Sequence, residues 1–150
     1  MENSNAITVV ANNEGPNLQV AGGKYRILVS GEQTNGNYAV IEMRVPSGGG
    51  PIPHAHKDIQ ETFYVAEGEM EFRTEGGKYY AKKGAFINIP LGGAIHAFKN
   101  TSGMEAVLIC TVIPAGFDSM FKEISVAAPE EIKAIAERYG NQLYAPVFLD

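Results

Sequence analysis

Cysteine is scarce in this sequence: Cys110 is the only one among 150 residues, so no disulfide can form within the chain. Because Cys110 lies in an apolar run, we expect it to be a small buried hydrophobic side chain. Residues 1–16 contain neither lysine nor arginine and no long apolar stretch, which is unlike a secretory signal peptide. The longest apolar-rich run, 106–117, contains a proline and is too short to span a bilayer. These absences favour a cytoplasmic protein that is not associated with a membrane.

Basic residues are also few, with 12 lysines and arginines against 17 aspartates and glutamates. The net charge of -5 argues against nucleic acid or an anionic membrane as the main partner. The chain is 45% apolar and 19% charged, as is ordinary for a globular protein. No linker, low-complexity tract or charge block divides it, so we expect one domain over residues 1–150.

Short runs of strand-forming residues recur between turns rich in glycine, asparagine and proline. We expect strands at 6–11, 24–30, 36–45, 52–56, 60–66, 69–74, 77–82, 85–89, 94–99 and 104–113. Many short strands at this spacing predict an all-β sandwich or barrel, with its core at about 24–114.

The strand expected at 104–113 is apolar on both faces. Alternation puts Leu108, Cys110 and Val112 on one face, opposite the side chains of Val107, Ile109 and Ile113. A strand of this kind needs cover on both sides, so its outer face should meet a helix or a partner subunit. We therefore expect a homodimer.

The segment at about 115–140 carries two helical patterns. The first has one apolar stripe, formed by Phe117, Met120, Phe121 and Ile124. The second begins near Pro129 and ends at Gly140, with a stripe formed by Ile132, Ile135, Ala136 and Tyr139. One or two C-terminal helices should therefore pack on the β structure.

Histidine occurs only three times, and its three positions form a pattern. His54 and His56 are two residues apart behind two prolines, so an extended backbone directs both imidazoles to the same face. Glu61 opens the next apolar run, and His96 comes from a third. These four side chains can meet only inside a closed or nearly closed β structure.

Three imidazoles and one carboxylate suit a divalent first-row transition metal. Catalytic zinc would be crowded by four protein ligands, so iron, manganese, nickel or cobalt fits His54, His56, Glu61 and His96 better. The remaining two positions of an octahedral ion would be open to a small molecule.

Two blocks of the chain resemble the signatures of the cupin superfamily. The first is Gly48-x5-His54-x-His56-x4-Glu61-x6-Gly68, and the second is Gly84-x5-Pro90-x-Gly92-x3-His96-x3-Asn100. The second departs from the family pattern by one residue between Gly92 and His96. The resemblance implies a jelly-roll barrel (a double-stranded β-helix) in which Glu61 is a metal ligand or a catalytic base. The segment GFDSMFKEIS also looks like single-domain cupins of the quercetin-dioxygenase type.

Strand alternation predicts a mainly apolar pocket around the metal. If Glu61 and His96 point inward, then so do Phe63 and Phe98, and Met70 and Phe72 are their partners on the strand at 69–74. Such a pocket excludes water and suits a planar organic molecule better than a sugar. The alternative for each aromatic ring is that it fills the barrel.

These features favour a metal-dependent dioxygenase that acts on a small enolic or aromatic substrate. Two alternatives stay open at this point. One is a non-catalytic module that binds or senses a small ligand through the metal. The other is a metal-dependent isomerase or decarboxylase, whose activity would persist without oxygen.

Overall fold

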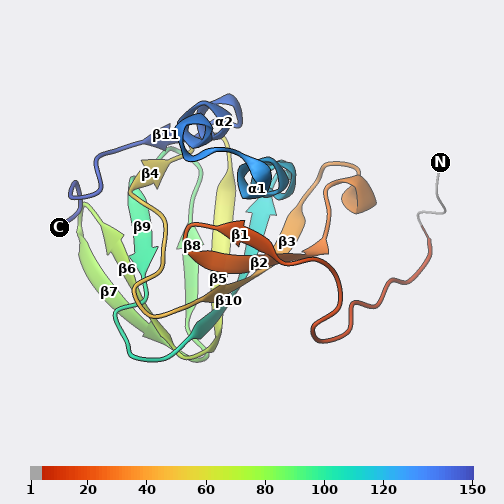
Figure 1. Ribbon diagram of the computed structural model, residues 1–150, viewed down its shortest axis with the longest axis horizontal. Helices are drawn as coiled ribbons and strands as arrows, with labels where there is room; N and C mark the ends of the chain where they lie inside the picture. The colour runs from red at the N-terminus through yellow and green to blue at the C-terminus, as the bar shows by residue number, and fades with distance from the viewer. Residues whose placement is uncertain (1–4) are drawn as a thin grey trace.

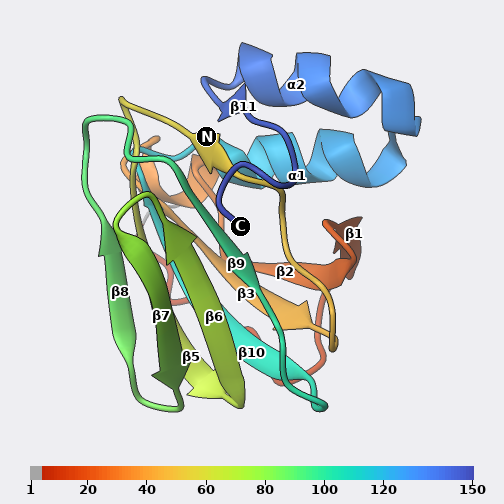
Figure 2. The same cartoon turned by 90° about the vertical axis from the view of Figure 1, so that its left-hand side faces the viewer.

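Two antiparallel β-sheets face each other, and two helices lie across one end of the pair (Figures 1 and 2). The computed structural model describes residues 5–150. The six-stranded sheet A contains, in spatial order, β1 Leu18–Val20, β2 Gly23–Val29, β3 Ala39–Val45, β10 Ala106–Ile113, β5 Gln60–Glu67 and β8 Phe86–Ile89. The five-stranded sheet B contains β11 Gln142–Leu143, β4 His54–Ala55, β9 His96–Lys99, β6 Glu69–Thr74 and β7 Gly77–Lys82. This is the double-stranded β-helix that the resemblance to cupins implied, and it agrees with the all-β architecture that the strand pattern predicted.

The core lies between the sheets and follows the alternation of the strands. In β3, Ile41 and Met43 point inward, and their register partners Cys110 and Leu108 in β10 lie on the same face. Because β-branched and long apolar side chains from adjacent strands meet there, their burial holds the two sheets together. The core extends across to Phe63, Phe72 and Phe98, whose rings lie 5.3–5.8 Å apart.

The C-terminal helices cover the end of the barrel. Helix α1 spans Phe117–Val126, a 3-10 turn η2 spans Pro129–Glu131, and α2 spans Ile132–Arg138. Phe117, Met120 and Phe121 are buried in the core cluster, as the helical stripe predicted. The backbone N–H of Gly31 donates to the Asp118 carboxylate at 2.7 Å, which ties the start of α1 to the loop after β2.

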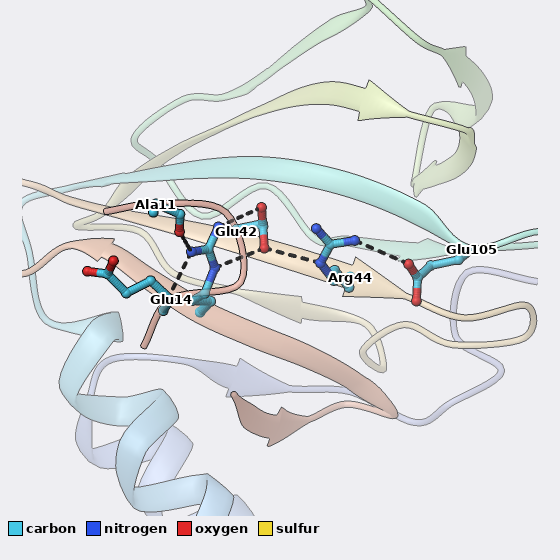
Figure 3. Close-up of polar contacts among 6 residues, drawn as sticks. Ala11, Glu14, Glu42, Arg44 and Glu105 are labelled. Carbon is cyan, nitrogen blue, oxygen red and sulfur yellow. Dashed lines mark hydrogen bonds and ion pairs between the residues drawn. The ribbon is translucent and has the colours of Figure 1, made fainter. Parts of the chain in front are cut away.

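The outer face of sheet A carries a line of charged side chains (Figure 3). Arg26 of β2 forms two hydrogen bonds with Glu42 of β3, at 3.2 and 3.1 Å. Its remaining nitrogen donates to the carbonyls of Ala11 and Glu14, at 2.8 and 2.9 Å. The N-terminal segment is therefore held against this face by one guanidinium.

The strand predicted at 6–11 is wrong. Those residues form no ladder, and Ile7 and Val9 are 93% and 80% exposed. The run has the β-branched composition of a strand, but Arg26 binds the segment at the carbonyls of Ala11, the last residue of the run, and Glu14, and no neighbouring strand pairs with 6–11. The strands β1 and β11 were not predicted from the sequence; they are only 3 and 2 residues long.

The outer face of β10 does not receive helical cover. Helix α1 packs on β1 and β3, and α2 packs on α1 and β11. Ile113 stays 40% exposed, whereas Val107 is buried. Of the two kinds of cover expected for this face, a helix or a partner subunit, the C-terminal helices do not supply the first, because both lie over the open end of the core.

Candidate metal centre

Three histidines and one glutamate converge between the two sheets. His54 in β4 pairs in register with His96 in β9, and their ring centroids are 4.4 Å apart. His56 directly follows β4, and Glu61 comes from β5 in the facing sheet. One ligand atom from each residue lies within 4.8 Å of the other three. The structure thus brings together all four residues that the spacing singled out.

The orientation of each imidazole is fixed by the backbone. Nδ1 lies against a carbonyl oxygen in every case: His54 against Ile52 at 2.8 Å, His56 against Ile59 at 2.9 Å and His96 against Ala94 at 2.8 Å. A carbonyl only accepts, so the hydrogen is on Nδ1 and the lone pair is on Nε2. This arrangement is typical of histidines that ligate a metal through Nε2.

The Glu61 carboxylate is placed by contacts on both oxygens. Its Oε1 lies 3.1 Å from Nε2 of His56 and 3.5 Å from Nε2 of His96. Its Oε2 accepts a hydrogen bond from the Cys110 thiol at 3.1 Å. While the imidazoles are neutral, Nε2 is an acceptor and faces the acceptor Oε1, so either a proton on His56, which then donates to Oε1, or a metal ion is needed between them.

Burial and this clustering shift the ionisation of the site. Burial and the neighbouring His96 lower the pKa of His54 to about 4. Burial alone would lower the pKa of His56, but the hydrogen bond and the charge of Glu61 outweigh it and raise that pKa. Burial favours neutral Glu61, yet the two adjacent imidazoles outweigh burial and hold the pKa of Glu61 well below its usual range. Burial raises the pKa of the Cys110 thiol, with Glu61 adding to the effect, so the thiol keeps its proton.

The residues present fit a divalent metal. Nε2 of His96 is buried and has no hydrogen-bond partner among residues 5–150. A buried nitrogen without a partner is costly, and a metal ion would satisfy it together with the other three donors. His54, His56, Glu61 and His96 would hold the ion.

Close backbone packing brings the two histidine blocks together. Gly50 has φ +140°, and a Cβ there would lie 2.0 Å from the carbonyl oxygen of Phe98, so only glycine fits. Gly93 has φ +86°, and a Cβ there would lie 3.2 Å from Cβ of Lys57. The loop before His96 therefore packs on the loop after His56, and the departure from the family spacing at Gly92 does not separate the ligands.

A cavity of about 300 Å³ opens beside the four residues. Its walls come from β1, β2, β3, β5, β9 and β11, from the segment before β4 and from both C-terminal helices, and they are mainly apolar. They include Val20, Met43, Ile52, Phe63, Phe98, Phe117, Met120, Phe121, Ile124, Ile132 and Leu143. His54 and Glu61 also line it, so the metal-binding cluster and the cavity share a wall.

Two of the four residues predicted to form the substrate pocket line this cavity. Phe63 and Phe98 are among its walls. Met70 and Phe72 are buried in the core instead, with the Phe72 ring 5.3 Å from Phe63. The role of these four side chains toward a substrate stays a prediction.

Sequence reasoning missed three polar groups of the site. Cys110 is buried as expected but also donates to Glu61. Tyr25 and Asn141 line the cavity. Strand alternation could have indicated Cys110 and Tyr25, because each is inward with apolar neighbours two positions away, whereas Asn141 follows a helix and carries no such signal.

Comparison with known proteins agrees with the fold and the signatures. The family model described as "Cupin domain" matches residues 41–112. Together with the double-stranded β-helix and both histidine blocks, this match places the chain in the cupin superfamily. No helix among residues 5–150 has the length and apolar character needed to cross a bilayer.

Individual relatives have different activities. The chain is 26% identical to quercetin 2,3-dioxygenase of Bacillus subtilis (strain 168) over 116 residues, which is 77% of this chain and 34% of that protein. It therefore spans about a third of that relative. A predicted oxalate decarboxylase from Thermotoga maritima superposes with a TM-score of 0.65 at 23% identity, over 71% of this chain and 99% of that one. The polyketide cyclase RemF from Streptomyces resistomycificus gives 0.64 at 22% identity, over 72% and 80%. Such structural likeness shows a shared fold only.

Proposed function

We propose that the protein is a metal-dependent oxidoreductase of the dioxygenase type, acting on a small enolic or aromatic compound. The observation that carries this proposal is the position of the His54, His56, His96 and Glu61 cluster on the wall of an apolar cavity. Apolar walls exclude water and accept a flat organic ring, while the cluster would receive the polar end of the same molecule. The similarity to a quercetin dioxygenase supports this substrate class.

The chain's own residues have separate roles in this proposal. The three histidines hold the metal, which would be iron, manganese, nickel or cobalt and would supply Lewis acidity to substrate oxygens. Glu61 is a metal ligand, and its carboxylate, which lines the cavity, accepts the proton of a substrate enol or phenol. The aromatic walls, among them Phe63 and Phe98, orient the ring.

Oxygen uptake tests the proposal. Protein loaded separately with each of the four metals is mixed with a panel of flavonols and 1,3-diketones, and oxygen consumption is followed with an electrode. Glu61→Gln keeps the size of the side chain but removes its charge, so it should lower uptake more strongly than it lowers metal content. No uptake with any metal across the panel would contradict the dioxygenase assignment.

A second candidate is a metal-dependent isomerase or decarboxylase. The position of the Glu61 carboxylate on the cavity wall supports it, because a base at this place also serves proton transfer without oxygen. The same panel in the absence of oxygen distinguishes the two, since only this candidate turns over substrate there. Tight binding without turnover in either condition would favour the third candidate, a non-catalytic ligand-binding cupin.

We also propose that the protein forms a homodimer through the outer face of sheet A. Tyr64 and Phe86 are register partners on that face and remain 44% and 64% exposed, and Ile113 lies on the same face. Neighbouring exposed apolar side chains on a sheet face are typical of association surfaces. Light scattering at micromolar concentration should give twice the chain mass, and a monomer would contradict the proposal.

A further inference from the structure

Tyr25 in β2 carries a polar group that the fold does not use. The side chain is only 3% exposed, and its ring packs edge-on against Phe121 with centroids 4.9 Å apart. It lines the cavity together with His54 and Glu61. Among residues 5–150, no side chain or backbone group forms a hydrogen bond with its hydroxyl. Within the described chain, Nε2 of His96 is the only fully enclosed side-chain nitrogen or oxygen that lacks a partner, so the unpaired Tyr25 hydroxyl is open to the cavity.

The packing of this residue does not need the hydroxyl. The ring that packs against it, Phe121 of α1, has no polar group, and a phenylalanine at position 25 would make the same ring contact. Burial raises the pKa of Tyr25, and the nearby Cys110 and Glu61 raise it further. The hydroxyl therefore keeps its proton at neutral pH and faces the cavity as a hydrogen-bond donor.

Asn141, at the other end of the chain, repeats this situation. Its side chain is buried and lines the same cavity, and its Nδ2 donates only to the sulfur of Met120, at 3.2 Å. Thioether sulfur is a weak acceptor, and Oδ1 has no partner within the described part of the chain. Besides the metal-binding cluster, the apolar cavity thus presents two polar side chains whose hydrogen-bonding capacity the protein does not fill.

The composition of the walls limits the chemistry of the ligand. No lysine or arginine is among the residues that line the cavity in the described chain. A small dianion would lose its hydration there with no basic side chain to compensate, and a sugar would leave most of its hydroxyls unpaired. A flat, largely apolar molecule with few oxygens has neither problem.

We propose that Tyr25 is a ligand-positioning residue, whose hydroxyl donates a hydrogen bond to an oxygen of a planar aromatic or enolic ligand in the cavity. The proposal deepens the proposed function and rests on it. The metal-binding cluster fixes one end of the ligand, the apolar walls enclose its ring, and Tyr25 selects ligands with an oxygen acceptor. Asn141 offers the complementary acceptor for a ligand hydroxyl.

Binding of two flat probes to Tyr25→Phe tests this role. Nickel-loaded protein is titrated without oxygen with 3-hydroxyflavone, which has oxygen acceptors, and with naphthalene, which has none. Loss of one neutral hydrogen bond should weaken 3-hydroxyflavone binding about three- to tenfold and leave naphthalene binding unchanged. The control Tyr80→Phe removes a hydroxyl from a side chain that is 70% exposed on β7, and it should change neither affinity.

Two further measurements separate the possible failures. The first is the metal content of the same samples. If the wild type binds no nickel, the metal site of the proposed function is contradicted. If the wild type binds nickel but has the same affinity for 3-hydroxyflavone as Tyr25→Phe, the role of Tyr25 is overturned. Equal weakening of both probes also overturns it, because it would indicate ring packing. Without ligand, Tyr25→Phe should melt at the same or a higher temperature than wild type, and a lower melting temperature would reveal a structural hydrogen bond instead. A wild type that binds neither probe overturns the ligand class.

Discussion

Each histidine of the candidate site uses one nitrogen for the fold and leaves the other for a ligand. Nδ1 of His96 is held by the carbonyl of Ala94, two residues earlier, and His54 is held in the same way by Ile52. The short reach of these bonds means that the backbone itself aims Nε2 into the site. Preorganisation of this kind lowers the cost of ordering the ligands when a metal binds.

His96→Ala tests the assignment of the ligands. We expect metal affinity to fall by more than about a hundredfold, because a directly bound donor is lost. The variant should stay folded, since apolar strands supply the core around it. Metal content by elemental analysis, with circular dichroism as the check on folding, measures both effects.

Lys99→Ala, at the exposed end of the same strand, is the matched control and should bind metal like wild type. The same experiment extends to His54→Ala and His56→Ala. Full stoichiometric metal in all three histidine variants would show that the site is elsewhere or absent.

Cys110 orients the carboxylate of Glu61 and does not itself bind the metal. Its thiol donates to Oε2 of Glu61, which leaves Oε1 facing His56 and His96. Cys110→Ala should therefore weaken metal binding about tenfold, in the range found when partners of metal ligands are removed. Cys110→Ser keeps a donor and should recover most of the affinity. Calorimetric titration with cobalt measures the affinities.

The absorption spectrum of bound cobalt gives a second measure, because it reports a reoriented carboxylate. Leu108→Val shortens another fully buried side chain of β10 and serves as the control for packing. An affinity and a spectrum of Cys110→Ala that match those of wild type would show that Glu61 does not depend on the thiol.

At the scale of elements, Arg26 joins three segments that are distant in sequence. Its guanidinium pairs with Glu42 on β3 and donates to the carbonyls of Ala11 and Glu14 (Figure 3). Arg26 and Glu42 are 6% and 8% exposed, so neither charge is well solvated. Removal of one partner would leave the other charge buried, and that is where the energetic cost lies.

Arg26→Met should lower the free energy of unfolding by about 3 kcal/mol, as measured by urea denaturation. It should also speed hydrogen exchange at residues 5–14, because their anchor is lost. The double variant Arg26→Met, Glu42→Leu removes both charges and should recover much of the stability. Arg44→Met is the control: Arg44 also pairs with Glu42 but is more exposed, so its loss should cost under about 1 kcal/mol. Equal costs for the two single variants would contradict the role of Arg26.

Local patterns predicted most elements but not their partners. The strands around the two histidine blocks and the helix stripe from Phe117 are set by alternation and by glycine-rich turns, which are local signals. The run at 6–11 has the same local signal, yet a strand also needs a pairing edge, and this depends on the whole sheet. For the same reason the metal ligands were predictable from their spacing, whereas the contact of Cys110 with Glu61 depends on the pairing of β10 with β5.

At the scale of the whole molecule, the site connects the two sheets. Sheet B supplies His54 and His96, sheet A supplies Glu61, and the C-terminal helices close the adjoining cavity. Anything that changes charge in the site therefore acts on the interface between the sheets. Protonation of the site should accordingly change the stability of the entire fold.

The pH dependence of unfolding in metal-free protein tests this coupling through His54. Its pKa falls from 6.5 to about 4 on folding. As the pH falls from 6.5 to 4, His54 binds a proton in the unfolded chain but not in the folded chain, so the folded state loses stability. The loss is at most about 3 kcal/mol, and less to the extent that solvent reaches the partly exposed ring. Glu61, whose pKa is lowered by folding, adds a further loss at pH values below 4.5.

His56 acts in the opposite direction. Its pKa is raised on folding, so its contribution is complete below pH 6.5 and is lost as the pH rises through the folded pKa. Urea unfolding of chelator-treated wild type and His54→Gln at about pH 7, 5.5 and 4.5 separates these effects. His54→Gln should lose clearly less stability than wild type between the first and last of these, because it lacks the depressed imidazole. Equal losses of unfolding free energy in the two proteins would show that protonation of His54 does not cause the loss of stability at low pH.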